Sequence, residues 1–427
     1  MERKDSPLLS IVIATRNRIP YAISAIQSIL EISDSRLELI IQDNSDSREL
    51  ESFIQGNVAD SRMVYRYTPP PFSSIDNFNA ALELSSGEYV CMIGDDDGVN
   101  PEILEAAAWA RKNDVDSLAV TCKAMYLWPN TGVGSTIFTK VTGATLAIRE
   151  LGDGMKQADI EKELLALVRN GGVYYLSYNL PKLYHGLVHR RCLEKVRSMT
   201  GAYFGGLSPD IFSSLAVACI ARRVVVTDYP LTIPGACGAS TSVIEGAIRK
   251  HSKKLEDAPH FRNRCAYNWS DLVPRVYTPE TIWADTGIAA LRAMGRTDLI
   301  QEFNMPKLAA HCIAANHGVT RRVLLDTLKG MRALRRRPVL GTLQLALYLP
   351  TVTSAKFAKR AWNRILMTIG VRRYHRIDNT ANMVEASHAL TSYLLERGLT
   401  FRIASSGMSP MHPAVDAQCV GDHFVGA

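Results

Sequence analysis

Three consecutive aspartates, Asp95 to Asp97, are the strongest chemical signal in the sequence. They follow the apolar run YVCMI, which predicts a strand. Like charges this close repel one another, and a divalent cation removes that cost. Carboxylate oxygens suit Mg²⁺ or Mn²⁺, which keep positions open for water and phosphate oxygens. The triplet therefore indicates either a metal site for a diphosphate or a solvated turn that caps the helix expected after Pro101.

Two further polar clusters follow predicted strands. Thr15, Arg16 and Asn17 come after an apolar run at residues 9–14, and Asp43 and Asn44 come after another at residues 37–42. In a parallel sheet the carboxyl ends of strands lie at one edge, where ligands bind. The three loops together predict a site for a nucleotide diphosphate, although the chain has no GxGxxG or Walker sequence in the required strand-to-helix context.

Alternating strands and helices must hold these loops. Further strands are predicted at residues 63–67 and 89–93, and helices after Pro20, at 49–54, at 75–84 and after Asn100. This spacing implies an α/β fold, with a mostly parallel sheet and helices on both faces. After about residue 245 the pattern changes to longer helical stretches without clear strands. We therefore expect one domain at residues 1–245 and a basic, mainly helical region at residues 246–427.

Charge divides the 427-residue chain at nearly the same point. Residues 1–240 carry a net charge of −5 and residues 241–427 a net charge of +12. The segment from Arg321 to Arg376 contains 14 Lys and Arg residues against one acid, interleaved with apolar residues. This pattern favours an anionic membrane surface, although charge runs are more often solvated faces. No recognised motif supports nucleic-acid binding. The uncharged stretch at residues 338–355 contains Pro350 and several polar residues, so it is a poor bilayer span.

Cysteine usage and the N-terminus predict the compartment. The eight cysteines form no CxxC pair and show no spacing typical of a zinc site or a disulfide framework. The first residues, MERKDSPLLS, lack the apolar core of a signal peptide. We expect reduced thiols in a cytoplasmic protein, which could also lie peripherally on the inner face of the membrane.

Three segments together resemble the family 2 glycosyltransferases, which have the GT-A fold. They are SIVIATRNR, LELIIQDNSDS and NAALELSSGEYVCMIGDDDGVNPEIL, in the order and spacing of that family. The resemblance is strong over residues 8–120 and weak to about residue 245. It implies an inverting, Mn²⁺- or Mg²⁺-dependent enzyme that moves a sugar from a nucleotide-sugar to a hydroxyl of a saccharide or lipid-linked acceptor. It also implies synthesis of a surface polysaccharide or glycolipid in a bacterium.

The resemblance assigns donor contacts to single residues. Thr15 and Asn17 match the first-loop positions near the base and the ribose. Asp43 resembles the acid that contacts the nucleobase, and Asn44 follows it in the same loop. Asn79 stands eight residues before the glycine of GEY, as the family's asparagine does.

The resemblance also orders the acids. Counted back from the proline of the third segment, Asp96 takes the place of the metal-binding aspartate and Asp95 that of the ribose-side acid. Asp97 is then a second ligand or a water-mediated partner. Gly94 replaces an aspartate found in many members. Phe78 replaces the arginine that commonly precedes the family's asparagine, which puts phosphate contacts from that side in doubt.

An inverting transfer needs a carboxylate that takes the proton of the acceptor hydroxyl. In the family this base lies about a hundred residues after the metal motif, at the start of a helix. Asp210, in GGLSPD before the apolar IFSSLAVACI, fits that position. Its other interpretation is a first-turn acid that complements the helix dipole. The family pattern is Glu-Asp, and Pro209 departs from it.

Several features stay open. His185 and His189 are either a metal or acceptor pair or, more often for such residues, structural histidines. The small-residue segment at 234–242 is either a lid over the diphosphate or an ordinary connector. A sugar nucleotidyltransferase would share the sheet and the acids, but ATRNR lacks the glycines of its first loop. A non-catalytic sugar-binding relative is the third alternative.

Overall fold

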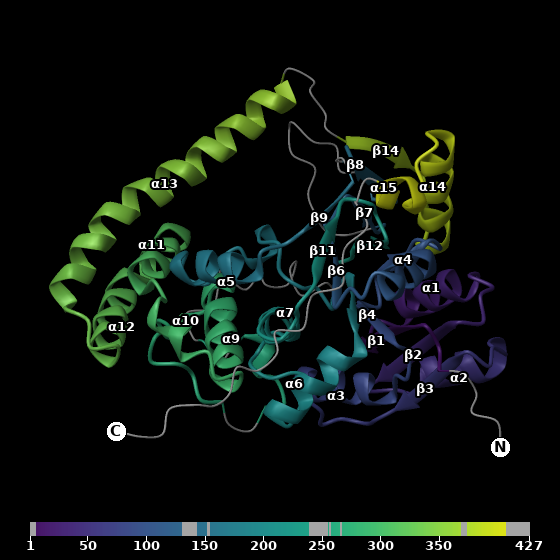
Figure 1. Cartoon of the computed structure of the whole chain (residues 1–427), viewed down its shortest axis with the longest axis horizontal. Coiled ribbons are helices and arrows are strands. Elements are labelled where there is room, and N and C mark those ends of the chain that lie inside the picture. Colours follow the sequence, from purple (N-terminus) through teal and green to yellow (C-terminus); the bar gives the residue numbers. More distant parts are fainter. Residues whose placement is uncertain are drawn as a thin grey trace, which may run out of the picture.

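A mostly parallel sheet forms the N-terminal half of the computed structural model, which describes residues 6–129, 143–151, 154–238, 255, 258–264, 267–368 and 374–406. Its strand order is β3-β2-β1-β4-β10-β6-β11-β9 (Figure 1). The strands are β1 (Leu9–Thr15), β2 (Leu37–Asp43), β3 (Met63–Tyr67), β4 (Tyr89–Ile93), β6 (Ser117–Val120), β9 (Met155–Gln157), β10 (Gly186–His189) and β11 (Val224–Thr227). Strands β1 to β4 pair in parallel, whereas β10 and β9 run antiparallel to their neighbours. The predicted α/β fold is confirmed.

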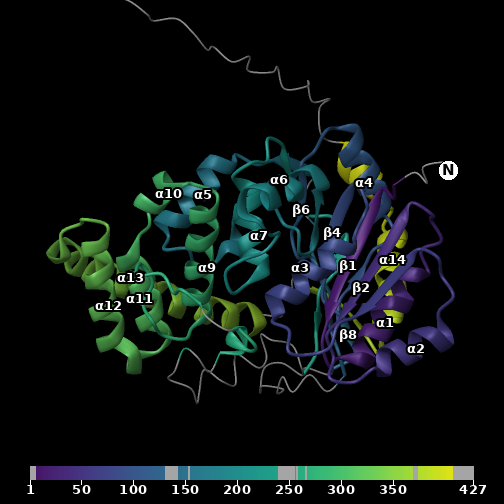
Figure 2. The ribbon, with the colours of Figure 1, turned by 90° about the horizontal axis from the view of Figure 1, so that it is seen from below.

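Helices cover both faces of this sheet because side chains alternate along each strand. In β1, Ile11 and Ile13 belong to one hydrophobic core and Val12 to the other. Figure 2 shows α1, α2 and α14 on one side and α3, α6 and α7 on the other. These helices and their neighbour α4 are α1 (Ile19–Leu30), α2 (Glu49–Asn57), α3 (Ser74–Leu84), α4 (Ile103–Lys112), α6 (Arg190–Thr200), α7 (Pro209–Ala218) and α14 (Met383–Glu396).

A helical region continues from the face that carries α7. Leu215 of α7 and Leu291 of α9 share one core with residues of the sheet. The region contains α5 (Ile160–Arg169), α9 (Pro279–Ala293), α10 (Thr297–Gln301), α11 (Met305–Ala315), α12 (Thr320–Ala333) and α13 (Pro338–Thr368), with short 3-10 helices η1 (Tyr175–Ser177), η3 (Pro259–Phe261) and η4 (His317–Val319). The expected helical C-terminal region is confirmed. The expected boundary at residue 245 lies outside the described residues and stays a prediction.

Two small sheets complete the architecture. Strand β5 (Gly98–Val99) pairs with β12 (Thr232–Ile233). The second sheet has the order β13-β7-β8-β14 and consists of β7 (Ala124–Leu127), β8 (Thr145–Arg149), β13 (Gly235–Ala236) and β14 (Tyr374–Asp378). The expectation of no strand after residue 245 is wrong at β14. That strand is short and largely exposed, and it forms by pairing with β8.

The chain returns to the N-terminal sheet after α13. The backbone N–H of Met383 donates to Ser24 Oγ at 3.0 Å, and the Met383 side chain packs on Gly98 so closely that a Cβ there would lie 2.5 Å from the sulfur. In α15 (Phe401–Ser406), the Phe401 N–H donates to Glu102 Oε1 at 3.0 Å. Residues 374–406 are therefore part of the structure that surrounds the carboxyl end of β4.

Within the part of the chain that the structure describes, no helix has the length and apolar character that a membrane crossing requires.

Because α14 packs on the N-terminal sheet, we expect two adjacent leucines of this helix to contribute differently to the free energy of unfolding. Leu394 is 2% exposed and Leu395 is 64% exposed. We expect Leu394→Ala to lower the free energy of unfolding by about 2–5 kcal/mol because it leaves a cavity in the core. The matched variant Leu395→Ala should change it by less than about 0.5 kcal/mol. Urea denaturation measures both, and equal small effects would contradict the docking.

Candidate functional site

The loops after β1, β2 and β4 meet at the carboxyl edge of the parallel strands. Thr15 lies beside Asp43 in the β1–β2 register, and β4 flanks β1 on its other side. The Thr15 hydroxyl donates to Asp95 Oδ2 at 2.6 Å. The backbone N–H of Asn44 donates to the Thr15 carbonyl at 3.0 Å. The structure thus brings the three polar loops of the sequence into direct contact.

Residues 94–97, here called the acid loop, are almost completely buried. Asp95, Asp96 and Asp97 are 2%, 5% and 3% exposed. Arg18, the residue before α1, spans the first two: its Nη1 lies 2.8 Å from Asp95 Oδ1 and its Nη2 lies 2.7 Å from Asp96 Oδ2. Because a buried carboxylate without a partner is strongly destabilising, this guanidinium stabilises the acid loop.

Asp97 ties the acid loop to its surroundings. Its Oδ2 accepts the Gly94 N–H at 2.5 Å, and its Oδ1 accepts the Gly235 N–H at 2.6 Å. His185 Nε2 lies 3.2 Å from Oδ2. Burial alone would raise the pKa of Asp97, but His185 and the two N–H donors outweigh burial and lower it. Asp97 is therefore held as a carboxylate that fixes the loop to β13.

Asp95 has a different charge balance. Burial, as the largest cause, and the neighbouring Asp96 raise the pKa of Asp95 to about 7, although Arg18 and the Thr15 hydroxyl oppose this shift. Further positive charge near the carboxyl would favour its ionised form. A cation bound beside Asp95 would therefore stabilise the carboxylate form of this residue.

The segment around β13 forms one wall of the site. Trp128 Nε1 donates to the Asp96 carbonyl oxygen at 2.8 Å. A Cβ on Gly235 would lie 1.8 Å from that same oxygen, so only glycine fits there. Gly235 belongs to the segment predicted as lid or connector. Residues 239–242 of that segment lie outside the described residues, so the lid stays a prediction.

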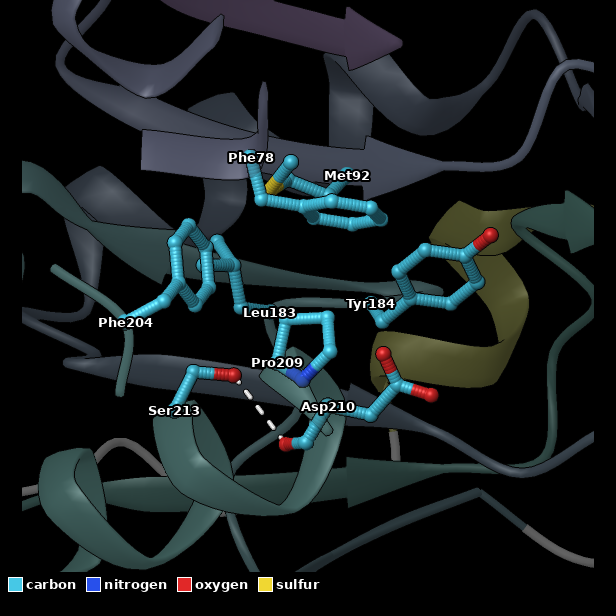
Figure 3. Close-up of a pocket in the computed structure, with 8 residues that line it drawn as sticks. All are labelled: Phe78, Met92, Leu183, Tyr184, Phe204, Pro209, Asp210 and Ser213. Atoms are coloured by element: carbon cyan, nitrogen blue, oxygen red, sulfur yellow. Dashed lines mark hydrogen bonds between the residues drawn. The ribbon is translucent and has the colours of Figure 1, made fainter. Parts of the chain in front are cut away.

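Asp210 lies in the first turn of α7, on the same side of the sheet edge. It lines a small pocket with Phe78, Phe204 and Tyr184, and Figure 3 shows its carboxylate pointing toward Tyr184. Burial, the largest cause, and the charge of Asp97 raise the pKa of Asp210 to about 6, while His185 opposes the shift. A carboxylate with this pKa can accept a proton near neutral pH.

Tyr184 links Asp210 to the acid loop. The backbone N–H of His185 donates to the Met92 carbonyl at 2.9 Å, which places this segment beside the end of β4. A Cβ on Gly94 would lie 2.7 Å from the Tyr184 hydroxyl oxygen. Burial, and then the negative charges of the acid loop and Asp210, raise the pKa of Tyr184 well above its usual range. Tyr184 therefore lies beside the acid loop and lines the same pocket as Asp210.

Asp43 and Asn44 are buried beneath the second loop. Asp43 Oδ1 accepts the Ser45 N–H at 2.8 Å and its Oδ2 accepts the Tyr65 hydroxyl at 2.9 Å. Asn44 Nδ2 donates to the Thr68 carbonyl at 2.9 Å. Both side chains hold the loop in place, and their predicted contacts with a nucleobase stay predictions.

Asn17 is exposed and joins the first two loops. Its Nδ2 donates to Asp46 Oδ2 at 2.7 Å, and its Oδ1 accepts the Asp46 N–H at 2.8 Å. Its φ of 57° is in the left-handed region, which asparagine tolerates better than most residues. These two reciprocal hydrogen bonds join the loop after β1 to the loop after β2. The predicted contact of Asn17 with the ribose stays a prediction.

Asn79 is bonded to the segment that precedes Asp210. Its Oδ1 accepts the backbone N–H groups of Tyr203 and Phe204, both at 3.0 Å, and its Nδ2 donates to the Phe204 carbonyl at 3.1 Å. The neighbouring Phe78 packs edge-on against Phe204. Among the described contacts, Asn79 therefore fixes the segment that precedes α7. Its predicted contact with the donor stays a prediction.

The two histidines separate into different roles. His189 is the N-cap of α6, where its Nδ1 accepts the Arg191 N–H at 3.1 Å. His185 contacts Asp97 instead. His189 therefore fits the interpretation as a structural histidine, whereas His185 lies at the acid loop. The described contacts do not join the two histidines as a pair.

Sequence reasoning missed Arg18, Tyr184 and Gly235. Arg18 offered a signal, because it is an arginine in the loop after the first strand, which was expected beside three acids. Gly235 stands in the small-residue segment predicted as lid or connector, but nothing in the sequence paired it with Asp97, 138 residues away. Tyr184 stands next to a histidine that the spacing had already singled out.

The acids can be compared with the needs of a divalent cation. Among the described residues, no group of three or more His, Cys, Asp or Glu side chains is arranged to hold a metal ion. The adjacent carboxylates of Asp95 and Asp96 still have the right donor chemistry, because Mg²⁺ commonly binds one or two carboxylates together with phosphate oxygens. Both Asp97 oxygens already accept N–H groups. Asp96 is thus better placed than Asp97, and both predicted ligands stay predictions.

Comparison with known proteins locates the similarity in the first half of the sheet. Residues 10–127 match the family model of glycosyl transferase family 2. A segment of 103 residues is 34% identical to "Putative colanic acid biosynthesis glycosyl transferase WcaA" of Escherichia coli (strain K12). That match covers 24% of this chain and 37% of the relative, so the chain spans little more than a third of the length of that protein.

Solved structures resemble the chain more loosely. S. aureus TarS 1–349 in complex with UDP is 14% identical, with a TM-score of 0.40 over 82% of this chain and 91% of that one. The mannosyltransferase PcManGT from Pyrobaculum calidifontis, in complex with GDP-Man and Mn²⁺, is 13% identical, with a TM-score of 0.34 over 80% and 88%. The family assignment therefore rests on the sequence match.

The matched residues 10–127 include the Thr15 loop, the Asp43 loop and the whole acid loop, which the structure joins at one sheet edge. Over these residues the chain is similar to glycosyl transferase family 2.

Proposed function

We propose that this chain transfers a sugar from a nucleotide-diphosphate donor to an acceptor hydroxyl, with inversion at the anomeric carbon and with the help of Mn²⁺ or Mg²⁺. The observation that carries this proposal is the position of Tyr184, which lies beside the acid loop and lines one pocket with Asp210. The candidate donor-binding acids and the candidate base therefore share one site, as a single-displacement reaction requires.

Asp210 is the proposed general base. It takes the proton from the acceptor hydroxyl while the hydroxyl oxygen attacks the anomeric carbon, opposite the departing nucleotide. Its pKa of about 6 leaves it mostly ionised at neutral pH and still able to accept a proton. Asp96, with Asp95 beside it, would hold the cation, which supplies positive charge to the leaving diphosphate.

The donor is proposed to lie along the first two loops. Thr15, Asp43 and Asn44 would line the base and ribose end, and Asn17 would flank its entrance. Asn79 would act through Phe204, since its hydrogen bonds fix the segment that leads to the base.

The acceptor is proposed to be a saccharide or a lipid-linked sugar. The name of the relative refers to colanic acid biosynthesis, and synthesis of a polysaccharide or glycolipid is the corresponding proposal for this chain. A cytoplasmic enzyme that docks on the inner face of the membrane would meet such a lipid.

Helix α13 offers a surface for that docking. Val339, Leu340, Leu343 and Leu347 are 72%, 53%, 60% and 70% exposed. Figure 1 shows α13 along the outer edge of the molecule. Exposed arginines at positions 332, 335 and 337 adjoin its N-terminal end. Apolar side chains beside basic ones match the chemistry of an anionic lipid surface.

Donor binding is expected to depend on the cation. In a thermal-shift screen, the matching nucleotide-sugar at a hundredfold excess over its Kd should stabilise the protein by about 2.7 kcal/mol when Mn²⁺ is present. The same donor should have little effect in EDTA, or with Mn²⁺ on the variant Asp96→Asn. Asp298→Asn, which changes an acid that is 62% exposed, is the matched control and should behave as wild type. Donor stabilisation that persists in EDTA would contradict the metal assignment.

The general base is expected to set the acid limb of the pH profile. The Asp210 carboxylate must be ionised, so kcat/KM for Mn²⁺-dependent release of nucleotide from the donor should rise with pH and level off above a pKa of about 6. Asp210→Asn should lower kcat by about 10²- to 10⁴-fold while the donor still binds, and Asp298→Asn should not. A wild type that binds the donor without any turnover would favour the non-catalytic alternative.

Membrane docking is expected to need both the charge and the apolar face. Sedimentation with vesicles should show binding to phosphatidylglycerol, weak binding to phosphatidylcholine, and loss of binding in the double variant Leu343→Glu/Leu347→Glu. Leu395→Glu, an equally exposed leucine on α14, is the matched control. Equal binding by the double variant and wild type would rule out α13 as the docking surface.

A further inference from the structure

Arg18 occupies the position in the site where positive charge is most needed. Its two terminal nitrogens lie within 2.8 Å of Asp95 and Asp96, so one guanidinium spans the pair of carboxylates proposed to hold the cation. Its Nη2 also lies 2.9 Å from Cys237 Sγ. A divalent cation bound to Asp96 would stand a few ångströms from the Arg18 charge and would be repelled by it.

The polar contacts of the Arg18 side chain are made by its two terminal nitrogens. The residue precedes the first residue of α1 and has non-helical dihedral angles, φ −128° and ψ 39°. Its side chain is 20% exposed, and its Nε has no hydrogen-bond partner among the described residues. A planar guanidinium binds phosphate oxygens as readily as carboxylates. The side chain therefore needs only rotation about its own bonds to exchange one anion for another.

We propose that Arg18 is a built-in counter-ion that the acid loop exchanges for the metal ion. In the donor-free enzyme the guanidinium pairs with both Asp95 and Asp96 and offsets part of their charge. When the donor binds, the guanidinium turns to the donor diphosphate and the cation binds Asp96. This inference rests on the proposed function, and it adds that cation and donor bind interdependently through one arginine.

The proposal predicts how the cation binds without a donor. Mn²⁺ titrations followed by electron paramagnetic resonance should give weak binding for wild type, and binding at least about tenfold tighter for Arg18→Gln, because the competing charge is gone. Arg16→Gln is the matched control: Arg16 is 3.1 Å from Asp46, and its loss should leave the Mn²⁺ affinity unchanged.

The proposal also predicts the coupling between the two ligands. Saturating UDP or GDP, whichever stabilises the protein, should tighten Mn²⁺ binding to wild type by about tenfold or more, and Mn²⁺ must tighten nucleotide binding by the same factor. In Arg18→Gln this coupling should fall several-fold, since the nucleotide no longer removes a competitor and loses one phosphate contact.

If Arg18→Gln does not fold, a second pair of variants tests the same exchange. Asp95→Asn and Asp95→Asn/Arg18→Gln both keep Asp96, and the double variant restores the charge balance of wild type at the acid pair. The double variant should bind Mn²⁺ about tenfold more tightly than Asp95→Asn.

The possible failures differ from one another. Equal Mn²⁺ affinities with and without Arg18 would overturn the exchange and leave metal-assisted transfer intact. Tight Mn²⁺ binding to wild type that nucleotide does not alter would do the same. If neither wild type nor Arg18→Gln binds Mn²⁺ with nucleotide present, the metal in the proposed function fails, and the exchange fails with it.

Discussion

Compensation of buried negative charge is the constraint on which the rest of this site depends. Three neighbouring carboxylates at the end of β4 are each at most 5% exposed, and burial disfavours the charged form of a carboxyl group. Arg18 pairs with the first two, and His185 and two backbone N–H groups contact the third. Each partner arrives on a different segment, so the fold must bring those segments together before the acids can be ionised.

The sequence carried enough information for the sheet and for the convergence of its loops. The bounds predicted for β3 and β4 match the structure. The β4 segment is an apolar run between turn signals, and the prolines at residues 69–71 stop β3. Strand β14 was missed because YHRID has no apolar alternation of its own and is strand only through its partner. The convergence of Thr15, Asn44 and Asp95 followed from the rule that parallel strands end at one edge.

The partners of the acids were harder to predict than the acids. Arg16 and Arg18 stand in one short motif, and only the three-dimensional path of the loop decides that the first contacts Asp46 and the second contacts Asp96. The spacing of His185 and His189 suggested a pair, but one precedes β10 and the other ends it, so their side chains serve different neighbours. Side-chain pairing across a fold depends on geometry that spacing along the chain does not contain.

The return of the C-terminal segment has a consequence for biosynthesis. Met383 packs on Gly98, the residue that follows the acid loop, and Ser387 Oγ donates to the Val99 carbonyl at 3.1 Å. A nascent chain whose first 245 residues have left the ribosome can form the strands of the main sheet but still lacks this support. Domains fold from the N-terminus during synthesis, yet here β5, which follows the acid loop, gains its contacts with α14 only after residue 387 emerges. The surroundings of β5 are therefore completed only after the strands of the main sheet have been synthesised.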